Sequence, residues 1–84
     1  MKFNYVYFME TQELNEYGTI ARYNYLFNDL KGVVDFMNTW DLVFLDRDQI
    51  IRLKHGDSAA IRSKKKRKYK DNFTIGRVES LHVR

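Results

Sequence analysis

Hydrophobic and polar residues alternate in two stretches of the N-terminal part of the chain, and this period of two predicts β-strands. The first stretch is KFNYVYFM at residues 2–9, and the second is TIARYNYLF at residues 19–27. The acidic stretch ETQELNEYG between them predicts an exposed connection that ends in a turn at Gly18. We expect the two strands to form an antiparallel pair.

The hydrophobic period changes after residue 27, where a helix is predicted. Asn28 is a good N-cap residue, and Asp29 would lie in the first turn. Apolar residues then follow at helical spacing, namely Leu30, Val33, Val34 and Met37. Asn38 and Thr39 favour an end to this helix near Trp40.

Three further stretches predict the rest of a sheet. The short apolar run DLVFL at residues 41–45 is typical of a buried central strand, and DRDQ after it predicts a polar turn. The alternating residues 50–55, IIRLKH, predict another strand that is closed by a Gly56-Asp57 turn. FTIGRVESLHVR at residues 73–84 predicts a last strand, with Gly76 as a bulge.

These elements predict one small α+β domain over residues 1–84, in the order β-β-α-β-β-basic loop-β. We expect a mostly antiparallel sheet of four to five strands with one helix packed on one face. The hydrophobic content of 44% is above that of disordered chains. The segment 58–71 carries too little apolar surface to join the core, so we expect an exposed basic loop or an exposed basic helix there.

Positive charge is concentrated near the C-terminal end of the chain. Residues 1–60 hold six Lys or Arg against nine Asp or Glu, a net charge of −3. Residues 61–84 hold nine Lys or Arg against two acidic residues, a net charge of +7. This asymmetry is typical of an element that binds a polyanion.

The stretch RSKKKRKYK at residues 62–70, here called the basic segment, holds seven cations in nine residues. A nucleic acid would relieve their mutual repulsion, and the excess of lysine over arginine favours sequence-independent phosphate contacts. The alternative is a solvated loop that keeps the protein soluble. The predicted nucleic-acid-binding residues are Arg62, Lys64, Lys65, Lys66, Arg67, Lys68, Tyr69 and Lys70.

Four tyrosines provide a second candidate surface. If the first two strands pair, Tyr5, Tyr7, Tyr23 and Tyr25 can share one face of the sheet. Such a face could stack unpaired bases, as single-stranded nucleic-acid-binding sheets do. The same tyrosines could instead form the hydrophobic core or the seam of a homodimer.

Catalytic and metal-binding signatures are weak. The sequence has no cysteine and no glycine-rich phosphate loop, so we expect no cofactor and no metal. Asp46 and Asp48 have the spacing of a divalent-cation site, which leaves a metal-dependent nuclease as an alternative. His55 and His82 stand far apart in the sequence without nearby ligand residues, and we expect no role in metal binding for them.

We therefore predict a small non-enzymatic, regulatory protein that binds DNA or RNA through the basic segment. The alternative is a small phage-type inhibitor or protein-interaction module that binds a host protein, such as a nucleic-acid-handling enzyme. The alternative partner to nucleic acid is an acidic protein surface. No apolar run is long enough to cross a membrane, and no secretion leader is present, so we expect a cytoplasmic protein without a membrane partner. KKKRK also looks like a nuclear-import signal, which would matter only in a eukaryotic cell.

Overall fold

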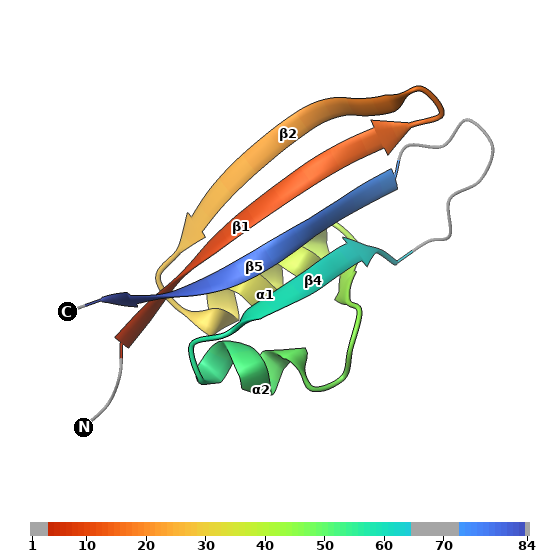
Figure 1. The fold of residues 1–84 in the computed structure, drawn as a ribbon. Helices are drawn as coiled ribbons and strands as arrows, with labels where there is room; N and C mark the ends of the chain where they lie inside the picture. Colours follow the sequence, from red (N-terminus) through yellow and green to blue (C-terminus); the bar gives the residue numbers. More distant parts are fainter. Residues whose placement is uncertain (1–3, 65–72, 84) are drawn as a thin grey trace.

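The computed structural model of the protein describes residues 4–64 and 73–83, and it shows an α+β fold. The elements are β1 (Asn4–Asn15), β2 (Gly18–Phe27), α1 (Leu30–Thr39), β3 (Leu42–Phe44), α2 (Gln49–Lys54), β4 (Ser58–Ser63) and β5 (Phe73–Val83). All neighbouring strands are antiparallel, in the order β2-β1-β5-β4-β3. The predicted α+β class with a mostly antiparallel sheet is confirmed (Figure 1).

The core lies between the sheet and both helices, which cover the same sheet face. Met9, Ile61 and Val78 project from the sheet, while Val33 of α1 and Leu53 of α2 meet them from the helices. These five side chains are fully buried. Figure 1 shows α1 passing behind the sheet, so the sheet face toward the viewer carries no helix.

The first two strands pair antiparallel, as the sequence predicts. The acidic stretch was wrongly expected to be an exposed connection: β1 continues through it to Asn15, and Thr11 within it is buried. The alternation of side chains simply continues, with Thr11 toward the helices and Glu10 away from them. The turn itself takes two residues, and Gly18 has a φ of 120°, in the region that favours glycine.

Helix α1 occupies the predicted residues, but its N-cap is Asp29 rather than Asn28. The Asp29 carboxylate accepts a hydrogen bond from the Gly32 backbone N–H at 2.8 Å. Val33 and Met37 are buried, in agreement with the predicted apolar face. Aspartate at the N-cap satisfies a backbone donor and places negative charge at the positive end of the helix.

The expected strand at residues 50–55 is instead the short helix α2. Gln49 and Leu53, four residues apart, are both buried, whereas Ile51 is exposed. A spacing of four places Gln49 and Leu53 on one helical face. This helical period decides the structure, although residues 50–55 also alternate as a strand would. The sheet therefore carries two helices, where the sequence predicted one.

Part of the segment 58–71 was wrongly expected to stay outside the sheet. Residues 58–63 form β4, which pairs with β3 on one side and β5 on the other. Its inward residues Ala59 and Ile61 are buried. These two apolar side chains suffice because pairing on both edges also holds the strand.

Gly76 is not at a bulge, because the pairing of β5 with both neighbours is continuous there. The irregularity lies instead between Glu13 and Leu14, where β1 pairs with β2. Among residues 4–64 and 73–83, no helix is long and apolar enough to cross a membrane.

Candidate functional site

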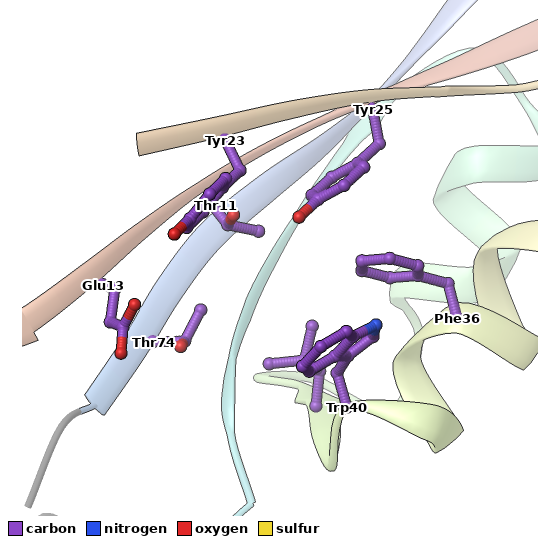
Figure 2. A pocket seen from close by; sticks show the side chains of 8 residues that line it. Thr11, Glu13, Tyr23, Tyr25, Phe36, Trp40 and Thr74 are labelled. Carbon is purple, nitrogen blue, oxygen red and sulfur yellow. The ribbon is translucent and has the colours of Figure 1, made fainter. Parts of the chain in front are cut away.

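The structure forms an aromatic cleft of about 290 Å³ at one end of α1, on the helix-covered side of the sheet. Its lining residues are Thr11, Glu13, Tyr23, Tyr25, Phe36, Trp40, Leu42 and Thr74. They come from β1, β2, α1, β3, β5 and the residue that ends α1. Figure 2 shows the tyrosines on one side of the cleft and Trp40 on the other.

Tyr25 and Phe36 close the inner end of the aromatic cleft. Their ring centroids are 4.5 Å apart at an interplanar angle of 49°, a packed aromatic contact. Tyr23 continues from Tyr25 along β2, with ring centroids 6.4 Å apart and an interplanar angle of only 24°. Because they stand two residues apart on one strand, both rings project from the same face of the sheet.

Trp40 forms the opposite wall of the cleft. It is the C-cap of α1, and its backbone N–H donates to the Phe36 carbonyl at 3.1 Å. Residues four apart on a helix project from one face, so the indole lies beside the Phe36 ring, with centroids 6.1 Å apart. Trp40 is 65% exposed and Tyr23 is 48% exposed, so the two rim rings are open to a ligand.

Polar groups lie at the end of the cleft farthest from Phe36. Glu13 and Thr74 stand side by side there, and Thr11 lies beneath Tyr23 (Figure 2). The carboxylate can accept hydrogen bonds, and the hydroxyls can both donate and accept. The aromatic cleft thus combines flat apolar walls with a polar end, as small-molecule and base-binding pockets do.

The aromatic cleft borders the end of β4 and the start of β5, between which most of the basic segment lies in the sequence. Asp41, next to Trp40, has a φ of 53° and turns the chain from α1 into β3. Its carbonyl accepts a hydrogen bond from the Lys64 backbone N–H at 2.7 Å. On the other side, the Thr74 backbone N–H donates to the Ser63 hydroxyl at 2.7 Å. The chain therefore leaves β4 and enters β5 next to the cleft.

Two of the predicted nucleic-acid-binding residues belong to the part of the chain that the structure describes. Arg62 is half-buried on the sheet face without helices, and its guanidinium donates to the Ser63 carbonyl at 3.3 Å. Lys64 is exposed. The other six, Lys65, Lys66, Arg67, Lys68, Tyr69 and Lys70, lie outside the described residues.

The four tyrosines share one sheet face, as their register requires, but they do not make one open platform. That face is the helix-covered one, and Tyr7 is buried in the core. Tyr5 is half-buried at the far end of the sheet, where its ring meets His82 edge-on with centroids 5.7 Å apart. The core interpretation therefore holds for Tyr7, while Tyr23 and Tyr25 line the aromatic cleft.

Sequence reasoning missed Phe36 and Trp40 as site residues. The available signal was their spacing of four on a predicted helix, beside the face of Val33 and Met37. Thr11 and Thr74 gave no signal, because only the pairing of β1 with β5 brings them close to Trp40.

The two aspartates of the nuclease alternative lie in the turn before α2. Asp46 and Asp48 are exposed, and their backbone carbonyls accept hydrogen bonds from Gln49 and Arg52. Lys54 and His55, expected on the next strand, lie instead at the end of α2. Within residues 4–64 and 73–83, no three His, Cys, Asp or Glu side chains are grouped to hold a metal ion.

Comparison of the chain with protein-family models, with curated proteins and with solved structures finds no match.

Proposed function

We propose that the protein binds single-stranded nucleic acid without catalysing a reaction on it. The basic segment contacts phosphates from Lys64 onward, and the aromatic cleft receives an unpaired base. The proposal joins the strongest feature of the sequence with the aromatic cleft of the structure. Bases in a duplex are stacked and paired, so a cleft with aromatic walls favours single strands.

The observation that carries the proposal is the position of the cleft beside the end of β4 and the start of β5, the two elements that flank the cations in the sequence. Asp41 follows the cleft residue Trp40 and holds the Lys64 backbone, while the cleft residue Thr74 holds Ser63. Each nucleotide carries its phosphate and its base next to each other. A protein that binds both groups of one strand therefore needs its cations and its aromatic rings close together.

Glu13 at the polar end of the cleft supports a base rather than a phosphate as the group that enters it. A carboxylate repels a phosphate but accepts hydrogen bonds from the amino and imino groups of bases. The phosphates would then remain outside, on the side of the basic segment.

The experiment is fluorescence anisotropy with labelled single- and double-stranded DNA and RNA over a series of salt concentrations. A variant with Lys65, Lys66, Arg67 and Lys68 changed to Gln is compared with a matched control. In the control, four exposed cations elsewhere are changed to Gln, namely Lys31, Arg47, Arg52 and Lys54. Both variants lose the same net charge.

We expect the wild type to prefer single strands, with an affinity that falls as salt rises. Each lost phosphate contact lowers the slope of log affinity against log salt by about 0.7 on a single strand. The basic-segment variant should lose most of this slope, and the control variant little of it. Equal effects of the two variants would contradict the proposal. Absence of binding to every strand at low salt would favour the alternative of an acidic protein partner.

A further inference from the structure

The sheet face opposite the helices, here called the uncovered face, carries large apolar side chains. The register places Val6 and Phe8 of β1, Leu26 of β2 and Leu81 of β5 on this face. Phe8 lies directly opposite Leu26, and Val6 lies directly opposite Leu81. Figure 1 shows no helix or strand of residues 4–64 and 73–83 in front of these strands.

This face departs from the pattern of a sheet with one solvated side. In such antiparallel sheets the solvent side is polar, which produces a clean alternation along each strand. Here Leu26 is 64% exposed and Leu81 is 43% exposed. Farther along the same face, Ile75 borders a groove of about 420 Å³ together with Ala60 and Leu45. Contiguous exposed apolar surface of this kind marks an interaction site.

We propose that a second copy of this chain covers the uncovered face, so that two sheets stack face to face in a two-fold dimer. The charges on the face favour this occupant. Glu10 and Arg77 lie opposite each other on neighbouring strands, and Arg77 also pairs with Glu79. In the next row of side chains on this face, Arg22 and Arg62 add positive charge at the two ends.

Charges of both signs on one face do not suit a polyanion or a strongly acidic protein surface. They suit a surface that meets itself, because a two-fold axis lets the acidic groups of each copy approach the basic groups of the other. Stacked sheets of equal twist also interdigitate their side chains at a spacing of about 10 Å.

The area of the uncovered face is close to what a stable dimer needs. Strands lie about 4.8 Å apart and rise about 3.3 Å per residue. The five strands, of 12, 10, 11, 6 and 3 residues, thus span roughly 670 Å² together. Standard interfaces bury about 800 Å² per partner. Small domains, whose cores are small, often gain stability from such association.

The aromatic cleft lies on the other side of the sheet, so this inference does not depend on the proposed function. Thr11 and Glu13 of β1 point to the cleft, whereas Phe8 and Glu10 point to the uncovered face. Stacking of the two sheets therefore leaves both clefts of the dimer open.

The test is sedimentation equilibrium of the purified full chain, together with the single variants Leu81→Lys and Leu26→Lys. We expect the wild type to sediment at twice the chain mass of 10.2 kDa. The proposed dimer would bury the lysine of either variant. Each variant should therefore sediment as a single chain at micromolar concentration. Both leucines are substantially exposed in the single chain, so the fold should survive, as circular dichroism would verify.

Ile51→Lys serves as the matched control, because Ile51 is 55% exposed on α2, away from the uncovered face. It should leave the dimer intact. Leu81 lies on the inner strand β5, so its variant separates face-to-face stacking from pairing along the free edge of β2. A wild type that sediments as one chain at all concentrations would overturn the proposal. A dimer that persists in Leu81→Lys would overturn it as well.

Discussion

Replacement of Trp40 by alanine should weaken binding of single-stranded nucleic acid while leaving the salt dependence unchanged. Stacking of one base on an aromatic ring contributes about 1 to 3 kcal/mol, which corresponds to a loss of about 5- to 150-fold in affinity. The indole contacts no phosphate in the proposed arrangement, so the slope of log affinity against log salt should stay that of the wild type. Neutralisation of the basic segment should produce the opposite pattern.

The effect of this substitution on stability should be small. Truncation of a fully buried Trp costs about 3 to 5 kcal/mol. Trp40 is 65% exposed, so only about a third of that cost applies and a loss of about 1.5 kcal/mol is expected. Urea denaturation measures this loss separately and shows that the variant is folded under the binding conditions.

The assay can observe the cleft directly, because Trp40 is the single tryptophan of the chain. Titration with an oligonucleotide should quench its fluorescence with the same dissociation constant that anisotropy gives. Trp40→Phe should retain part of the affinity, since a smaller ring still stacks. Tyr17→Ala is the control, because Tyr17 is 88% exposed and does not line the cleft. Binding without quenching, or equal losses in Trp40→Ala and Tyr17→Ala, would refute the role of the cleft.

Two further predictions concern the fold. Gly76→Ala should lower the free energy of unfolding by about 3 kcal/mol in urea titrations, because a Cβ would lie 2.2 Å from the Glu10 carbonyl oxygen of β1. In Gly18→Ala the new Cβ has no atom within 4 Å, and only the φ of +120° opposes the substitution. The free energy of unfolding should therefore fall by only about 1 to 2 kcal/mol. A loss equal to that of Gly76→Ala would contradict the steric argument. Burial, together with Tyr5 and Asp29, raises the pKa of Tyr7, so its contribution to stability is complete below about pH 10 and is lost as the pH rises through the folded-state pKa. In urea titrations from neutral to alkaline pH, the free energy of unfolding should therefore fall less in Tyr7→Phe than in the wild type. The same fall in both proteins would contradict this prediction.

The fold class could be predicted from the sequence because its longest elements have clear periods. β2 and α1 each carry one regular pattern of apolar residues, and the structure places both close to the predicted bounds. Residues 49–55 fit both the period of a strand and the period of a helix. Ile51 and Leu53 follow the alternation of a strand, while Gln49 and Leu53 share a helical face. Tertiary packing decides between them: Leu53 is fully buried, and its carbonyl accepts a hydrogen bond from the Ser80 hydroxyl of β5 at 2.7 Å.

The candidate site was only partly visible in the sequence. The cations of the basic segment are adjacent in the chain and could be recognised directly. The aromatic cleft, in contrast, joins residues as distant as Thr11, Trp40 and Thr74, and their proximity depends on the order of strands in the sheet. The same is true of β4, whose Ala59 and Ile61 reach the core only because the strand pairs with both neighbours.

The alternation of side chains along β1 lets the two proposals be tested independently of each other. Thr11 lines the aromatic cleft and Phe8 lies on the uncovered face, on opposite sides of the same strand. Substitutions at distant sites without shared contacts have nearly additive effects. Leu81→Lys should therefore leave the quenching of Trp40 by a short oligonucleotide unchanged, and Trp40→Ala should leave the dimer unchanged. Loss of quenching in a folded Leu81→Lys monomer would mean instead that the dimer itself completes the nucleic-acid site.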